Sequence, residues 1–146
     1  MDRALDERLM RRAIELARAA LGTTGDNPAV GCVIAFRDVV VAEAATAPGG
    51  RPHAEEQALA KAGEAARGAT AYVTLEPCAE RSSGAASCSL RLMGAGIARV
   101  VVAAADPSSK ASGRGDEVLQ EAGVSLETGF LADEADPLYA EYRRKF

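Results

Sequence analysis

Two short stretches decide how this chain folds: Ala71-Tyr72-Val73-Thr74-Leu75-Glu76-Pro77-Cys78 and, upstream of it, Pro52-His53-Ala54-Glu55. The first stretch begins as a β-rich run and reaches a proline that stops the strand. Cys78 therefore lies just past a strand, where we expect a helix start or a tight turn, and such a place favours a thiolate. A second cysteine, Cys88, follows after a gap of nine residues.

The segment from about His53 to Ala65 is predicted to be a helix. Its apolar residues recur at i, i+4, i+5 and i+8, which is a helical stripe, and Pro52 is a common helix-start residue. His53 and Glu55 then lie on the first turn of this helix. There the free backbone N–H groups and the helix dipole favour a nearby negative charge.

The residue types in these two stretches indicate a zinc site. His53, Cys78 and Cys88 offer one imidazole and two thiolates, which can fill three corners of a zinc tetrahedron and leave the fourth for water or substrate. Zinc lowers the pKa of bound water from about 15.7 to roughly 7, and a separate group must then transfer the protons, for which Glu55 is the candidate. Taken singly, such residues are more often caps or core residues. The only histidine of the chain, however, lies in the one place where H-x-E precedes P-C.

Length and composition limit the kinds of protein that this chain can be. The 146 residues predict one domain, 1–146, and the absence of Trp means a core built from Ala, Val, Leu and Ile. A net charge of −4 argues against broad nucleic-acid binding. We find no secretory or membrane-spanning pattern and expect a cytoplasmic protein with reduced or metal-bound thiols. Cys32 falls in a predicted strand, as a core residue or as part of a pocket wall.

The order of elements predicts an α/β fold of three layers, α/β/α, around a mixed five-stranded sheet. The connection between the first two strands is only two residues long, 37–38, which allows nothing but a hairpin. We expect helices over 4–21, 53–65, 87–93, 114–122 and 133–145, and strands over 30–36, 39–46, 71–75, 99–104 and 124–128. Both metal-bearing segments follow strands and start helices, so they are expected to meet at one end of the sheet, where ligand sites of open α/β sheets lie.

These motifs resemble the cytidine-deaminase-like superfamily, and within it the RibD-type pyrimidine deaminases of bacterial riboflavin biosynthesis. The matching segments are 27–34, 52–55, 69–78, 94–101, 106–107 and 113–115. The resemblance implies that His53, Cys78 and Cys88 bind zinc, that Glu55 is the proton shuttle and that Asn27 contacts the substrate. It also implies hydrolytic deamination of a 2,5-diamino-6-ribosylamino-pyrimidinone 5'-phosphate, and a homo-oligomer, most simply a dimer.

The departures from that family concern the substrate. The segment 79–87 between the two cysteines lacks the family's His and prolines, Thr46 stands where a His is common, and 106–109 reads Asp-Pro-Ser-Ser. Arg81 and Arg114 are candidates to bind an anionic group of the substrate, with exposed arginines as the alternative, and Asp106 is a further candidate contact.

Three other interpretations stay open. The substrate can be a different nitrogen heterocycle, nucleobase or nucleoside, including one from secondary metabolism. A transfer-RNA adenosine deaminase is disfavoured by the acidic net charge and by the long gap between the cysteines. A zinc-stabilised interaction module without activity would need a fourth protein ligand, such as Cys32.

Overall fold

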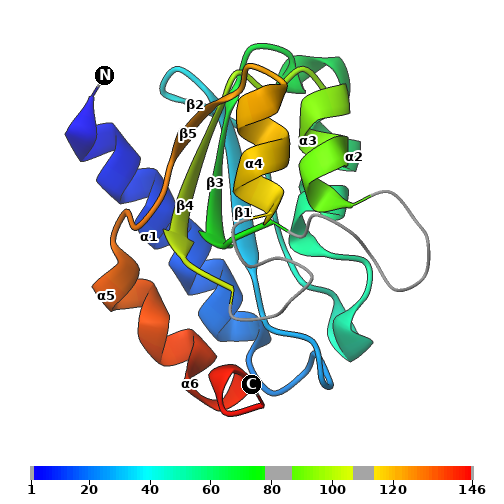
Figure 1. The fold of residues 1–146 in the computed structure, drawn as a ribbon, viewed down its shortest axis with the longest axis vertical. Coiled ribbons are helices and arrows are strands. Elements are labelled where there is room, and N and C mark those ends of the chain that lie inside the picture. Colours follow the sequence, from blue (N-terminus) through cyan, green and yellow to red (C-terminus); the bar gives the residue numbers. More distant parts are fainter. Residues whose placement is uncertain (1, 78–86, 107–113, 146) are drawn as a thin grey trace.

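A computed structural model of the chain describes residues 2–77, 87–106 and 114–145 (Figure 1). In chain order the elements are α1 (Arg3–Ala20), β1 (Gly31–Phe36), β2 (Val39–Ala45), η1 (Pro48–Gly50), α2 (Ala54–Ala62), η2 (Gly63–Ala66), β3 (Thr70–Leu75), α3 (Cys88–Gly94), β4 (Arg99–Ala104), α4 (Arg114–Glu121), β5 (Ser125–Glu127), α5 (Ala132–Ala135), η3 (Asp136–Tyr139) and α6 (Ala140–Arg143). The predicted α/β class and five-stranded sheet are confirmed.

The sheet has the order β2-β1-β3-β4-β5 and is mixed. Strand β1 runs antiparallel to both β2 and β3, whereas β3, β4 and β5 are parallel to one another. As a result, the start of β1 lies at the same edge of the sheet as the ends of β2, β3 and β4. Four connections that are distant in sequence meet at this edge, which we call the site edge.

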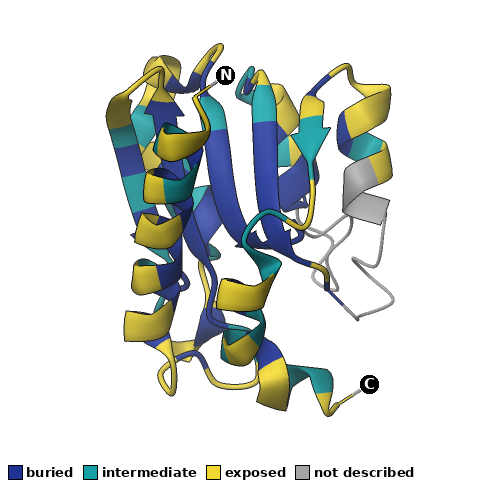
Figure 2. Ribbon diagram, turned by 90° about the vertical axis from the view of Figure 1, so that its left-hand side faces the viewer, coloured by how far each residue is buried: buried dark blue, intermediate teal, exposed yellow. Residues whose placement is uncertain are grey.

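Helices cover both faces of the sheet, as the three-layer prediction requires. Helix α1 lies on one face together with the segment α5–α6, and α2, α3 and α4 lie on the other (Figures 1 and 2). Gly31 permits the close approach of α1, because a Cβ atom at this position would lie 1.9 Å from the carbonyl oxygen of Ala13. Backbone cannot yield to such a contact, so the packing of α1 on β1 needs glycine here.

The core between these layers is built mainly from small aliphatic residues, as the composition predicts. Most of its fully buried side chains are Ala and Val, with few aromatic rings among them. Figure 2 shows the central strands almost wholly buried and the outer sides of the helices exposed. In the described part of the chain, we find no helix with the length and apolar character needed to cross a membrane.

Two predicted helices differ from the structure. The helix expected over 53–65 ends at Ala62, because Gly63 adopts a positive φ of 55° and the chain continues as the 3-10 turn η2. The helix expected over 133–145 is divided into α5, η3 and α6. Pro137 lies in the first turn of η3, and its missing N–H and ring interrupt the α-helical hydrogen bonds.

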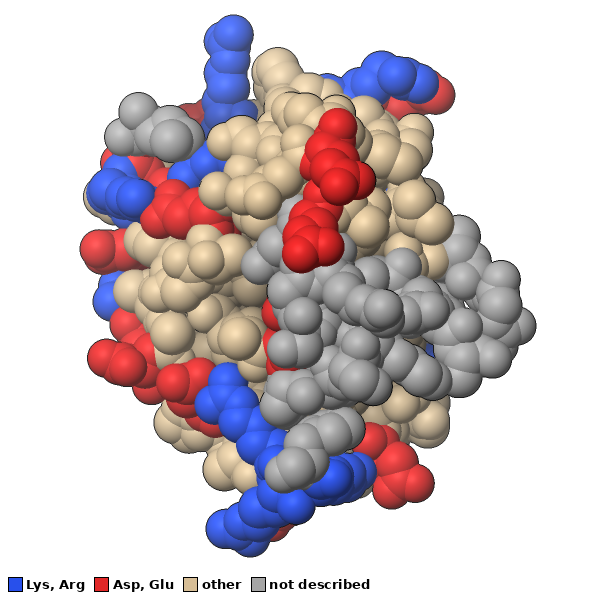
Figure 3. All heavy atoms as spheres, viewed as in Figure 1, with Lys and Arg blue, Asp and Glu red and all other residues tan. Residues whose placement is uncertain are grey.

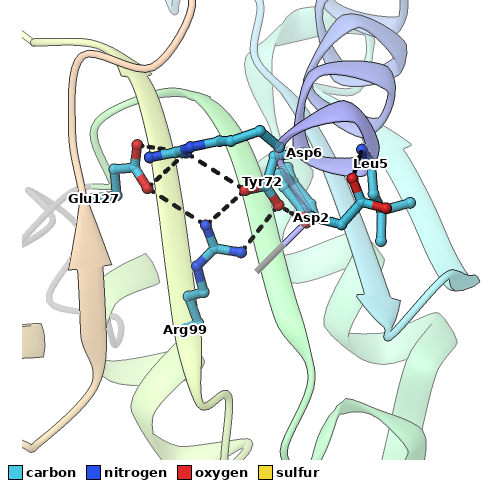
Figure 4. A network of polar contacts seen from close by, with 7 residues as sticks. Asp2, Leu5, Asp6, Tyr72, Arg99 and Glu127 are labelled. Carbon is cyan, nitrogen blue, oxygen red and sulfur yellow. Dashed lines mark hydrogen bonds and ion pairs between the residues drawn. The ribbon is translucent and has the colours of Figure 1, made fainter.

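A buried ionic network ties α1 to the sheet at the edge opposite the site (Figure 4). The Asp6 carboxylate, which is 2% exposed, accepts two hydrogen bonds from Arg99, at 3.0 and 2.9 Å, and one from the Tyr72 hydroxyl at 2.7 Å. Arg99 lowers the pKa of Asp6, against the opposing effect of burial. Asp6 therefore stays ionised inside the protein, and its charge is matched by the guanidinium group.

We expect Asp6→Asn to lower the free energy of unfolding by about 3 kcal/mol at pH 7, because it removes the buried carboxylate from Arg99 and leaves it only the more exposed Glu127. A carboxyl group whose pKa is lowered by folding stabilises the protein above its unfolded pKa of about 3.9 and loses that effect as the pH falls through the folded value. The difference between variant and wild type should therefore shrink below about pH 4. Urea denaturation at several pH values measures this.

The matched control is Glu43→Gln, which breaks an exposed pair with Arg12. Solvent screens this pair, so the control should lose much less stability. Equal losses for the two variants, or a loss for Asp6→Asn that does not change with pH, would contradict the assignment.

Candidate metal and catalytic site

The starts of α2 and α3 lie together at the site edge. His53 is the N-cap residue of α2 and Ser87 is that of α3, both with extended backbone, and the Ser87 hydroxyl accepts a hydrogen bond from Leu90 N at 3.2 Å. These caps make each helix begin where it does. The helix predicted over 87–93 is therefore confirmed, with Cys88 as the first residue of α3, and His53, which was expected on the first turn of its helix, lies directly before it.

The side chains of His53 and Cys88 approach each other across the two helix starts. The distance from His53 Nδ1 to Cys88 Sγ is 3.3 Å, and Cys88 is buried. Two ligands of a tetrahedral zinc ion, with Zn–N and Zn–S bonds of about 2.0 and 2.3 Å, lie about 3.5 Å apart. The pair thus has the donor types and the spacing of two zinc ligands.

Glu56 is a neighbour of this pair that the sequence interpretation missed. Its Oε1 accepts a hydrogen bond from the His53 backbone N–H at 3.4 Å, and its Oε2 lies 3.7 Å from Arg91 Nη2. Among the described residues, the ligand atoms of His53, Glu56 and Cys88 all lie within 4.8 Å of one another. The pattern of an N-cap residue followed three positions later by Glu is the signal that predicts this contact.

Glu55 lies on the first turn of α2 and is buried, with an exposure of 4%. Its charge acts on Cys32 of β1, whose pKa is raised well above the usual value, chiefly by complete burial and further by Glu55. Cys32 is therefore a protonated core thiol. This agrees with the core interpretation of Cys32, whose sulfur is not in the group of ligand atoms that His53, Glu56 and Cys88 form among the described residues.

The loops around the site edge hold two further predicted residues. Asn27 Nδ2 donates to the carbonyl oxygen of Gly50 at 2.9 Å, in the connection that leads to His53. Asp106 is 7% exposed, and its backbone N–H donates to Glu76 Oε1 at 3.4 Å. Thr46, one of the positions at which the sequence departs from the expected pattern, is buried and accepts a hydrogen bond from Val30 N at 2.9 Å.

Three predicted site residues are not placed. Cys78 and Arg81 lie outside the described residues, and Arg114 begins α4 but its side chain lies outside them. The last described residue before Cys78 is Pro77, whose carbonyl oxygen accepts a hydrogen bond from Ser89 Oγ at 3.4 Å. The segment leading to Cys78 therefore contacts the first turn of α3, next to Cys88.

Comparison with known proteins gives the family. Residues 3–104 match the cytidine and deoxycytidylate deaminase zinc-binding region. The chain belongs to this family. The match includes His53, Glu55, Cys78 and Cys88, the residues of the predicted metal and proton-transfer site.

Three relatives define its place among these deaminases. RibD of Escherichia coli is 46% identical over 133 residues, which are 91% of this chain and 36% of that protein. The diaminohydroxyphosphoribosylamino-pyrimidine deaminase of Buchnera aphidicola is 44% identical over 126 residues, 86% of this chain and 85% of the relative. The structure of Acinetobacter baumannii RibD superposes with a TM-score of 0.91 at 42% identity, covering 97% of this chain and 39% of that one. The chain thus spans little more than a third of the RibD proteins and most of the shorter deaminase.

We expect Cys32 to resist alkylation in the folded deaminase domain, because burial keeps its thiol protonated and out of contact with solvent. Mass spectrometry after treatment with iodoacetamide at pH 7.5 measures this, with urea-unfolded protein as the control that shows full labelling. Labelling of Cys32 at the same rate in folded and unfolded protein would contradict its placement.

Proposed function

We propose that this domain hydrolytically removes an exocyclic amine from an aminopyrimidine. The leading substrate is a riboflavin intermediate of the 2,5-diamino-6-ribosylamino-pyrimidinone 5'-phosphate type, because the Buchnera aphidicola relative is named a diaminohydroxyphosphoribosylamino-pyrimidine deaminase and aligns over most of both chains. The observation that carries the proposal is the 3.3 Å approach of His53 Nδ1 to Cys88 Sγ, together with a buried Glu55 on the first turn of the helix that His53 caps. A cytoplasmic location, a dimer and a single domain stay predictions.

His53, Cys78 and Cys88 would hold the metal ion. The match to a zinc-binding region, the donor types and the spacing of His53 and Cys88 support zinc, and the Ser89–Pro77 contact supports the participation of Cys78. When bound, zinc supplies the Lewis acidity that makes a water molecule nucleophilic near neutral pH. The protein would fix His53 and Cys88 at two helix starts and leave one position of the metal open to water or the heterocycle.

Glu55 would transfer the protons of the reaction. The carboxylate accepts a proton from the attacking water, gives it to a ring nitrogen, and passes a second proton to the departing ammonia, so that C–NH₂ and water become C=O and NH₃. Its place on the first turn of α2 supports this role, because the free N–H groups and the helix dipole stabilise the ionised carboxylate. Burial of the side chain keeps bulk water from competing for these protons.

The substrate contacts are the finer part of the proposal. Asn27 and Asp106 lie in loops of the site edge, and Arg81 and Arg114 stay candidates for an anionic group of the substrate. The unusual segment 79–87 keeps a different nitrogen heterocycle as the alternative substrate. A transfer-RNA substrate is less favoured, because acidic and basic side chains are interspersed on the described surface in Figure 3 and the net charge is −4.

We expect His53→Ala and Cys88→Ser each to lower the bound zinc from about one ion per chain to well below half, because each removes one of three protein ligands. Inductively coupled plasma mass spectrometry of the purified protein measures the ratio. Glu56→Gln is the matched control, because a glutamine at this position keeps the hydrogen bond to the His53 N–H. Full zinc content in both ligand variants would contradict the proposed metal site.

We expect Glu55→Gln to lower kcat by about 100- to 10,000-fold while zinc content stays normal, since the amide cannot transfer protons. Ammonia release from the diaminopyrimidine ribosyl phosphate, measured beside zinc content, tests this. Glu56→Gln changes the neighbouring carboxylate and should keep most of the activity. Undiminished turnover in Glu55→Gln would remove the assigned proton shuttle.

A further inference from the structure

The segment formed by η3 and α6 reaches the site edge from the face of the sheet opposite α2 and α3 (Figure 1). Two of the three tyrosines of the chain, Tyr139 and Tyr142, lie on it. Each of the two donates its hydroxyl group to a connection at the site edge. The third, Tyr72, belongs to the Asp6 network at the other end of the sheet.

Tyr139 holds the chain that enters β1. Its hydroxyl donates to the carbonyl oxygen of Ala29 at 2.8 Å, so it must accept the hydrogen bond that joins it to Thr74 Oγ1 at 2.6 Å. Thr74 Oγ1 in turn accepts from the Gly31 N–H at 3.0 Å. The direction of each hydrogen bond is therefore fixed: Thr74 donates to Tyr139, and Tyr139 donates to Ala29. Tyr139 is fully buried, which raises its pKa and keeps the hydroxyl protonated.

Tyr142 and Arg143 hold the connection that leaves β4. The Tyr142 hydroxyl donates to Asp106 Oδ1 at 3.1 Å, and Arg143 Nη2 donates to the Ala105 carbonyl oxygen at 3.2 Å. Arg143 is itself fixed by Asp136 at 3.0 Å, a residue of η3. The same short segment therefore fixes the start of β1 and the end of β4.

Both connections touch the segments that carry the proposed metal ligands. Asn27, two residues before Ala29, donates to the Gly50 carbonyl oxygen, three residues before His53. The Asp106 N–H donates to Glu76 Oε1, two residues before Cys78. Each of the two connections that η3 and α6 hold is therefore joined by a hydrogen bond to a segment that carries a proposed metal ligand.

We propose that Tyr139 and Tyr142 are positioning residues, which fix the walls of the substrate pocket through the connections at Asn27 and Asp106 and so set the affinity for the heterocycle. This inference rests on the proposed deaminase function. The two tyrosines act through the residues they hold, so their loss should affect substrate binding more than the chemical step.

The test compares three tyrosine-to-phenylalanine variants, each of which removes one hydroxyl group. We expect Tyr142→Phe and Tyr139→Phe to raise KM for the diaminopyrimidine ribosyl phosphate by roughly three- to tenfold with kcat changed less than about twofold, the range expected for one lost hydrogen bond. Tyr72→Phe is the matched control: it removes a hydroxyl–carboxylate hydrogen bond far from the site and should leave KM unchanged.

Hydrogen–deuterium exchange of the zinc-containing protein gives a second measurement that needs no substrate. Amides of residues 26–31 should exchange faster in Tyr139→Phe, and those of 103–106 faster in Tyr142→Phe, with neither affected in Tyr72→Phe. If buried Tyr139 does not tolerate the change, the more accessible Tyr142 carries the test.

The outcomes separate this inference from the proposed function. An active wild type whose KM is unchanged in Tyr142→Phe, or raised equally in Tyr72→Phe, would overturn the positioning role alone. A zinc-loaded wild type that releases no ammonia from aminopyrimidines would overturn the proposed function, and the inference with it.

Discussion

The antiparallel insertion of β1 between β2 and β3 is the constraint on which the site depends. In a wholly parallel sheet the start of β1 would lie at the far edge from the ends of β3 and β4. Because β1 is reversed, its entry loop, the connection after β2 and the ends of β3 and β4 share one edge. The residues that carry chemistry then come from connections, while the central strands β1, β3 and β4 are almost wholly buried.

The start of α2 shows how one residue can serve both the helix and the site. An N-cap residue commonly uses its side chain to accept a hydrogen bond from the first helical turn. At this helix start Glu56 accepts the His53 backbone N–H, so part of the capping is done by a neighbouring carboxylate. One of the free backbone N–H groups of the helix start is thus bound by Glu56, while the imidazole of His53 lies 3.3 Å from Cys88 Sγ.

Much of the fold could be predicted from the sequence because its elements have clear periodicity and clear stops. Gly22 has a positive φ of 84° directly after the cap of α1, and the two residues 37–38 form the expected hairpin turn. The division of the last helix was missed because its apolar spacing continues past Pro137. The contact of Glu56 with His53 was missed because the pattern of an N-cap residue followed three positions later by Glu usually begins with Ser or Thr, whereas here it begins with His.

The hydrogen bonds of Tyr139 and Tyr142 could not be predicted in the same way. They join residues 110 and 36 positions apart, and a tyrosine on an amphipathic helix predicts only partial burial. The family match over residues 3–104 contains the metal-bearing segments but neither tyrosine. The motif therefore specifies the donors of the site, whereas the rigidity of the connections beside them depends on tertiary contacts from a segment outside the matched region. Walls that are already ordered lower the free-energy cost of binding a small heterocycle, so the proposed positioning role extends the site beyond the matched motif.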